Sequence, residues 1–65
     1  MTRKERLVYK VIKYYYEVFN EYPTSKIINI LLGKTAYNKR TINSLIKKGY
    51  VRKTFFNWLV IVKWI

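Results

Sequence analysis

The sequence predicts an α+β domain in which three helices are followed by a C-terminal β-hairpin. Pro23, Gly33 and Gly49 divide the chain of 65 residues into four segments, because proline and glycine are the residues that most often interrupt regular structure. Apolar residues recur at helical spacing in the first three segments, whereas the fourth is rich in β-branched and aromatic residues. A chain of this length forms one domain, which we assign to residues 1–65.

The first helix is predicted over residues 3–19. Thr2 and Glu5 form a T-x-x-E capping box, which is a common start signal for a helix. The helix ends before Pro23, because the residue that precedes a proline disfavours the helical conformation. Apolar residues at helical spacing predict its buried face. This face consists of Leu7, Val8, Val11, Ile12, Tyr15, Val18 and Phe19.

The second and third helices are predicted over residues 25–32 and 36–48. Thr24 and Thr35 are suitable N-caps, since a threonine hydroxyl can accept a hydrogen bond from the first turn of a helix. Gly33 lies where a C-cap glycine belongs. The predicted buried stripes are Ile27, Ile28, Leu31 and Leu32 in the second helix, and Ile42, Leu45 and Ile46 in the third.

The hairpin is predicted over residues 50–64, with its turn near Phe56-Asn57. Alternation along the second strand predicts two faces. One face consists of Trp58, Val60, Val62 and Trp64, and the other contains Leu59 and Ile61. Both faces are apolar, although the helices can cover only one of them. We therefore expect the other face to contact a partner, because monomers rarely expose apolar patches of this size.

The charge balance is strongly basic, and the composition excludes several classes of function. Fourteen Lys and Arg oppose three Glu, which gives a net charge of +11, and the chain contains no Asp, His or Cys. Zinc, haem and iron–sulfur sites lack their ligands, and histidine-assisted or paired-carboxylate catalysis lacks its residues. We therefore expect no enzymatic activity, no metal, no cofactor and no small-molecule ligand. No stretch has the ~20 apolar residues of a membrane span, so we expect a cytoplasmic location, in the nucleoid or in a host cell.

The third helix carries a candidate DNA-binding face. On a helical wheel its polar residues lie opposite the apolar stripe. Arg40 is near the centre of that face, and its planar fork suits a guanine edge in the major groove. The alternative interpretation is a solvated face whose lysines keep a small apolar domain soluble. The candidate DNA-binding residues are Lys26, Lys34, Thr35, Tyr37, Lys39, Arg40, Thr41, Asn43, Ser44, Lys47, Arg52 and Lys53.

Residues 23–51 carry a resemblance to a known family. They read P-T-S-K-I-I-N-I-L-L-G, then K-T, then A-Y-N-K-R-T-I-N-S-L-I-K-K-G-Y-V, and this order resembles winged helix-turn-helix DNA-binding domains. The helix junction N-E-Y-P-T is similar to that of LexA-type repressors, and the small basic chain resembles regulators of archaeal viruses and plasmids. Two features differ from the family pattern. Asn29 replaces a small alanine, and the hairpin tip reads Phe55-Phe56-Asn57-Trp58 where DNA-contacting wings carry Gly, Arg or Lys.

The resemblance implies a sequence-specific regulator of transcription that binds double-stranded DNA. We expect it to act as a homodimer on a pseudo-palindromic site. The alternative is a winged-helix protein-interaction module that inhibits or recruits a partner protein through its apolar hairpin. A third possibility is a basic membrane-active peptide. It is disfavoured because Pro and Gly residues separate the predicted elements, which indicates a compact fold. The candidate dimer-interface residues are Tyr9, Tyr16, Phe19, Val60, Ile61 and Trp64.

Overall fold

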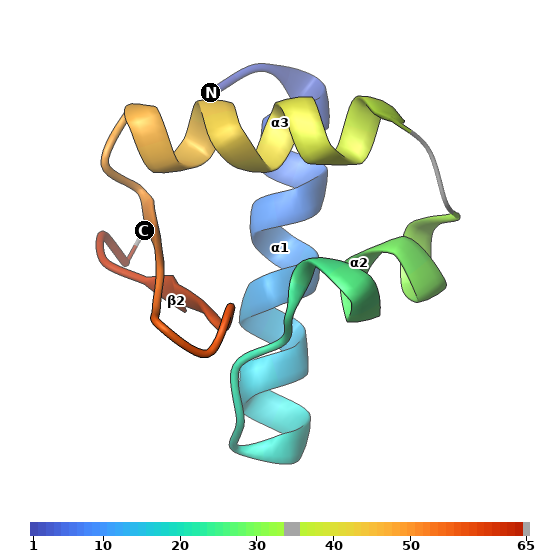
Figure 1. The fold of residues 1–65 in the computed structure, drawn as a ribbon, viewed down its shortest axis with the longest axis vertical. Helices are drawn as coiled ribbons and strands as arrows, with labels where there is room; N and C mark the ends of the chain where they lie inside the picture. Colours follow the sequence, from blue (N-terminus) through green and yellow to red (C-terminus); the bar gives the residue numbers. More distant parts are fainter. Residues whose placement is uncertain (34–35, 65) are drawn as a thin grey trace.

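The computed structural model describes residues 1–33 and 36–64, and within these ranges the chain is α+β, with three helices followed by a two-stranded antiparallel hairpin (Figure 1). The elements are α1 (Arg3–Phe19), α2 (Ser25–Leu32), α3 (Ala36–Lys47), β1 (Val51–Lys53) and β2 (Leu59–Ile61). The predicted order is confirmed, and α1 and α2 have the predicted bounds. α3 ends one residue before the predicted boundary, and the strands are shorter than the predicted hairpin. Thr35, the predicted N-cap of α3, lies outside the described residues.

Both ends of α1 are fixed by local hydrogen bonds. The Thr2 hydroxyl accepts a hydrogen bond from the Glu5 N–H at 3.2 Å, and the Glu5 carboxylate accepts one from the Thr2 N–H at 2.6 Å. The predicted capping box is therefore confirmed. At the other end, Asn20 adopts the left-handed conformation with φ 56°, and its N–H donates to the Tyr16 carbonyl. Asparagine tolerates this conformation better than most residues, so the helix stops here.

α2 and the hairpin are joined through the short segment that precedes α2. The Thr24 hydroxyl accepts a hydrogen bond from the Ile27 N–H at 3.4 Å, which confirms Thr24 as the N-cap. Thr24 also forms an isolated antiparallel bridge with Trp58, and the Leu59 N–H donates to the Pro23 carbonyl at 2.7 Å. These contacts hold the start of β2 against the start of α2.

The hairpin turn lies where the sequence predicted it. The Asn57 N–H donates to the Thr54 carbonyl at 2.9 Å, and Asn57 has a positive φ of 66°. This geometry fits a three-residue loop whose last residue is left-handed. In the strand register, Val51 pairs with Ile61 and Arg52 pairs with Val60. Val51 and Ile61 are buried, so Val60 lies on the opposite, outward side of the hairpin beside Arg52.

The hydrophobic core draws residues from every described helix and strand. It contains Val8, Tyr9, Ile12, Ile28, Ile42, Leu45, Val51, Leu59 and Ile61. Two of these, Tyr9 and Ile61, were predicted at a dimer interface, and that prediction is wrong. Ile61 faces the helices, and the Tyr9 hydroxyl reaches across the core to donate to the Lys63 carbonyl at 2.7 Å.

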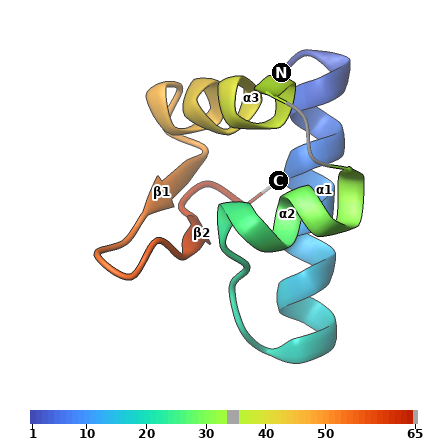
Figure 2. The same ribbon diagram turned by 45° about the vertical axis from the view of Figure 1, so that its right-hand side comes forward.

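The predicted buried face of α1 is also partly wrong. Val8 and Ile12 are buried as predicted, but Leu7, Val18 and Phe19 are exposed. The buried stripe is rotated toward Glu5 and Tyr9, because α3 and β2 pack on that side of α1. Figures 1 and 2 show that α3 crosses the N-terminal half of α1. The C-terminal end of α1 projects beyond the rest of the fold.

A buried carboxylate links α1 to α3. Besides its capping role, Glu5 accepts hydrogen bonds from the Ser44 hydroxyl and from the Lys48 ammonium, the latter at 3.0 Å. These bonds, from Ser44 first, then from the Thr2 N–H and Lys48, lower the pKa of Glu5 from 4.5 to about 2. The sequence indicated only the cap. The link to Ser44 and Lys48 depends on residues about forty positions away, so no local pattern in the sequence identifies it.

We expect the Glu5 contacts to make folding stability depend on acid pH. Because the folded-state pKa lies below the ordinary value of 4.5, the stabilisation is complete well above pH 4.5 and is lost as pH falls from about 4.5 toward 2. Glu5→Gln is expected to have a lower melting temperature at pH 7 and a flatter acid dependence. Circular dichroism melts across this range measure both quantities.

Glu17→Gln is the matched control, since Glu17 lies exposed on the same helix. It is expected to keep the acid dependence of the parent protein. Parallel loss of stability in the parent and in Glu5→Gln between pH 5 and pH 2 would contradict this role of Glu5.

Candidate nucleic-acid interface

α3 presents a polar stripe to solvent on the side away from the core. Lys39, Arg40, Asn43 and Lys47 are all exposed, and their spacing places them on one side of the helix. The buried side of α3 consists of Asn38, Thr41, Ile42 and Leu45, with Ile46 half-buried beside it. The structure therefore brings together four of the predicted DNA-binding residues as one continuous surface.

Two other predicted DNA-binding residues of α3 do not face outward. Thr41 is only 6% exposed, and Ser44 is half-buried with its hydroxyl donating to Glu5. Those two predictions are wrong. The helical wheel was centred on the apolar stripe of Ile42, Leu45 and Ile46. The fold also buries Asn38 and Thr41, which rotates the outward face toward Lys39 and Asn43.

Asn38 is another buried polar residue that the sequence did not reveal. Its amide nitrogen donates to the Gly33 carbonyl at 2.7 Å and to the Asn29 side-chain oxygen at 3.3 Å. It therefore satisfies a carbonyl at the end of α2 and fixes the position of α3 against α2. Asn29, which departs from the alanine of the family pattern, faces α3 in this contact. That departure was the one available signal of a polar contact between these helices.

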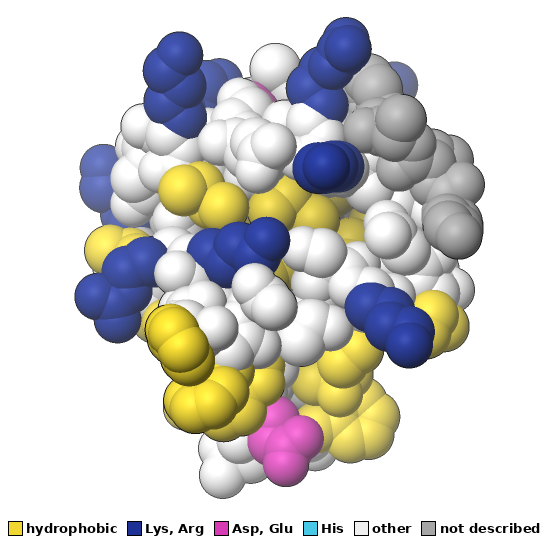
Figure 3. All heavy atoms as spheres, viewed as in Figure 1, with side chains coloured by type: hydrophobic (Ala, Val, Ile, Leu, Met, Phe, Trp, Pro, Cys, Tyr) yellow, Lys and Arg dark blue, Asp and Glu magenta, His cyan; other side chains and the backbone are white. Residues whose placement is uncertain are grey.

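The outward surface of α3 continues onto α2 and β1. Lys39, Ile42 and Asn43 of α3 line a small cleft of about 150 Å³ together with Ser25, Asn29 and Lys53. Lys26 on α2 and Arg52 on β1 are exposed as well. Figure 3 shows Lys and Arg side chains spread over this face of the molecule, above α3, the hairpin and α2. Lys34, Thr35 and the side chain of Tyr37, also predicted to bind DNA, lie outside the described part of the structure.

The hairpin tip adds aromatic side chains to this basic face. Phe55, Phe56 and Trp58 are all exposed, and Phe55 has the highest exposure of the large apolar side chains among the described residues. Figure 2 shows the hairpin projecting from the body of the molecule, away from α1. The tip is thus apolar, whereas β1 immediately before it carries the exposed cations Arg52 and Lys53.

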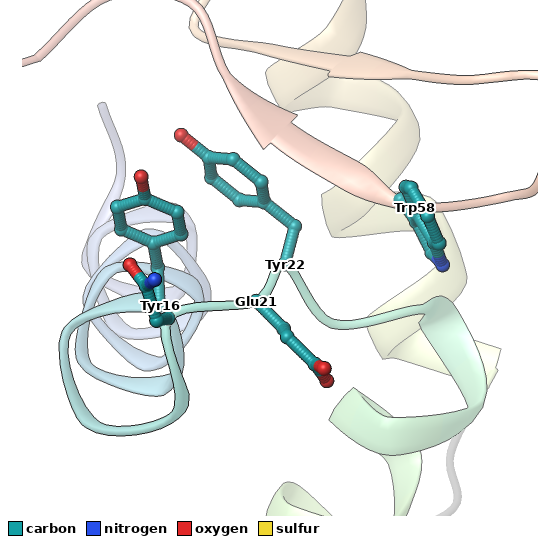
Figure 4. A pocket seen from close by; sticks show the side chains of 5 residues that line it. Tyr16, Glu21, Tyr22 and Trp58 are labelled. Atoms are coloured by element: carbon teal, nitrogen blue, oxygen red, sulfur yellow. The ribbon is translucent and has the colours of Figure 1, made fainter.

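Trp58 of the hairpin tip also lines an aromatic pocket at the C-terminal end of α1. The pocket has a volume of about 350 Å³ and is lined by Tyr16, Asn20, Glu21, Tyr22 and Trp58. The rings of Tyr16 and Tyr22 are stacked with centroids 4.2 Å apart, and Trp58 lies across from them (Figure 4). Burial raises the pKa of Tyr22. The Glu21 carboxylate repels phosphate, so we exclude this pocket from a nucleic-acid interface.

A second apolar surface lies between α1 and α2. Val11, Tyr14, Tyr15, Val18, Phe19, Leu31 and Leu32 line a groove of about 290 Å³. Of the predicted dimer residues, Phe19 belongs to this groove, whereas Tyr16 packs edge-on against Trp64 on another side of α1. Val60 lies on the hairpin opposite Arg52. The predicted interface is therefore divided between separate surfaces.

No family model, curated protein or solved structure matches this chain. Among residues 1–33 and 36–64, no helix combines the length and apolar character needed to cross a membrane. The same residues bring together no group of three or more His, Cys, Asp or Glu side chains that would hold a metal ion.

Proposed function

We propose that the protein is a winged helix-turn-helix regulator of transcription that binds double-stranded DNA in a sequence-specific manner. The observation that carries the proposal is the exposed stripe of α3, in which an arginine and an asparagine lie between two lysines. A helix of this kind fits the major groove, where Arg40 can pair with guanine and Asn43 with adenine. The order of three helices and a hairpin among the described residues is compatible with this fold.

The remaining exposed cations are assigned to the phosphate backbone. Lys39 and Lys47 flank the reading residues on α3, while Lys26 on α2 and Arg52 and Lys53 on β1 lie at the edges of the same surface. Contacts of this kind position a protein on the duplex and supply affinity without reading sequence. Thr41 and Ser44 have no part in the interface, because the fold turns them inward.

Selection from random duplexes, followed by sequencing, tests the proposal. We expect one enriched motif. Binding to it should also weaken by roughly 10³-fold between 50 mM and 200 mM salt, as expected for about six neutralised phosphates. Heparin is the control polyanion, because it tests charge without base edges. Recovery of unselected sequences, with equal affinity for heparin and duplex, would contradict sequence-specific recognition.

We further propose that the protein acts on DNA as a homodimer joined through the groove between α1 and α2. Residues 14–24 contain Glu17 and Glu21 but no Lys or Arg, and the residues that line the groove are uncharged. Two copies of a chain with a net charge of +11 repel each other. This repulsion is weakest where they meet through a surface without positive charge. The outward hairpin face is less suitable, because Val60 lies beside Arg52.

Leu31→Glu is expected to convert the dimer into a folded monomer. Leu31 lines the groove and is 54% exposed, so the added carboxylate leaves the core unchanged but must be desolvated in a dimer. Sedimentation velocity at tens of micromolar measures the oligomeric state. Ile30→Glu is the matched control, since Ile30 is 72% exposed on the same helix and lies outside the groove. A parent protein that sediments as a monomer would refute self-association.

A further inference from the structure

We infer that the hairpin tip is an aromatic wedge that inserts Phe55 between neighbouring base pairs and unstacks the duplex beside the site read by α3. This inference rests on the proposed DNA binding and adds a second, distinct contact to it. Its basis is the geometry of Phe55, Phe56 and Trp58 and the charge of the residues around them.

The rings at the tip form a connected series that ends in solvent. Phe55 is 94% exposed, and its ring lies perpendicular to that of Phe56 with centroids 5.5 Å apart. Phe56 in turn packs against Trp58 with centroids 5.6 Å apart. Phe55 therefore has one flank supported by a neighbouring ring and the rest of its surface open to a ligand.

The backbone of the turn that carries these rings is fixed by hydrogen bonds. The Thr54 N–H donates to the Trp58 carbonyl at 3.0 Å, and the Trp58 N–H donates to the Thr54 hydroxyl at 3.2 Å. The Asn57 N–H closes the turn on the Thr54 carbonyl. Since the loop is closed by three hydrogen bonds, little ordering of the backbone remains when the tip binds, which lowers the entropic cost of inserting its exposed ring.

The charge around the tip indicates the class of ligand. Arg52 and Lys53 precede it, and Lys53 shares a cleft with Lys39 and Asn43 of α3. The carboxylate of Glu21 shares a pocket with Trp58, which is at the end of the ring series away from Phe55. A ligand with an anionic backbone and flat apolar rings suits both the cations and the exposed rings, and nucleic acid is such a ligand. DNA-bending proteins use phenylalanine and other apolar side chains in this way, wedging them between base steps in the minor groove.

The experiment uses the full chain and its selected duplex, with 2-aminopurine placed in turn at each position around the α3 site. Unstacking increases the fluorescence of this base. At saturating protein we expect the fluorescence to rise at one base step, and we expect Phe55→Ala to abolish this rise. A mismatch at that step lowers the work of unstacking. It should therefore increase the affinity of the parent protein for the duplex by about tenfold and leave the affinity of Phe55→Ala unchanged.

Leu7→Ala is the matched control, because it removes an exposed apolar side chain from α1 rather than from the hairpin. It should preserve both the fluorescence rise and the preference for the mismatch. Normal duplex binding with no fluorescence change at any position would overturn the wedge and leave α3 recognition intact; the tip would then be free for a partner protein. Failure to bind any duplex would overturn the proposed function itself.

Discussion

Ile61→Glu is expected to unfold the protein, whereas Val60→Glu, one position away, should leave it folded. Ile61 is 4% exposed and pairs with the buried Val51. A carboxylate there meets no cation among the described core residues, and burying it costs at least about 4 kcal/mol. A domain of 65 residues has a total stability of about 3–10 kcal/mol, so the substitution removes a large share of it, and at the lower end of this range most of the population unfolds. Circular dichroism and thermal melting measure the difference.

Val60→Glu serves as the control for the same substitution on the other side of the strand. Val60 pairs with Arg52 across the hairpin, so a glutamate there gains an opposite charge, worth roughly 0.2–1 kcal/mol. We expect a native spectrum but weaker DNA binding, because Arg52 is then partly neutralised. A folded Ile61→Glu protein would show that β2 does not close the core.

Arg40→Ala is expected to reduce affinity for the selected duplex by about 5- to 150-fold, the range of one bidentate base contact. Its affinity for unrelated duplexes should fall much less. Lys26→Ala is the comparison, since Lys26 is exposed on α2 at the edge of the same surface. It should weaken all duplexes about equally and reduce the slope of log K against log salt by about 0.9.

Gel shifts with the selected duplex and a scrambled duplex distinguish these outcomes. Arg40→Ala should lower the ratio of the two affinities, whereas Lys26→Ala should preserve it. An unchanged ratio in Arg40→Ala would remove this side chain from base recognition and direct attention to Asn43.

The order and most boundaries of the elements could be predicted because local chemistry determines them. Thr2 and Glu5 cap α1, Thr24 caps α2, and the change of apolar spacing after Gly49 marks the hairpin. Each of these signals acts within a few residues, so it can be recognised in one sequence. The positions of Lys39, Arg40, Asn43 and Lys47 on an exposed surface follow from the same periodicity.

The orientation of each helix could not be predicted to the same degree, because it depends on distant residues. Glu5 is buried because Ser44 and Lys48 satisfy its charge, and Asn38 is buried because it bonds the end of α2. A wheel centred on the apolar residues Ile42, Leu45 and Ile46 does not anticipate buried polar side chains, so it turns the outward face toward the wrong side. The error at Thr41 and Ser44 has this origin.

The surfaces left uncovered were also hard to predict from one chain. Tyr9 was assigned to an interface because it shares one edge of the helix with Tyr16. Ile61 was assigned to it because alternation along the strand does not show which of the two apolar faces the helices cover. Core and interface residues share this apolar character. The groove between α1 and α2 combines residues from two segments, and only their packing shows which of them remain exposed.

The separation of the two sides of α3 has a consequence for how the protein can evolve. Positions 39, 40, 43 and 47 face solvent, while the residues that hold the helix in place occupy other positions. Exposed substitutions rarely change stability by more than about 0.5 kcal/mol, so the outward positions can vary without approaching the limit of foldability. A duplicated copy of this chain could therefore acquire a new target by changing these side chains alone, with its core inherited intact.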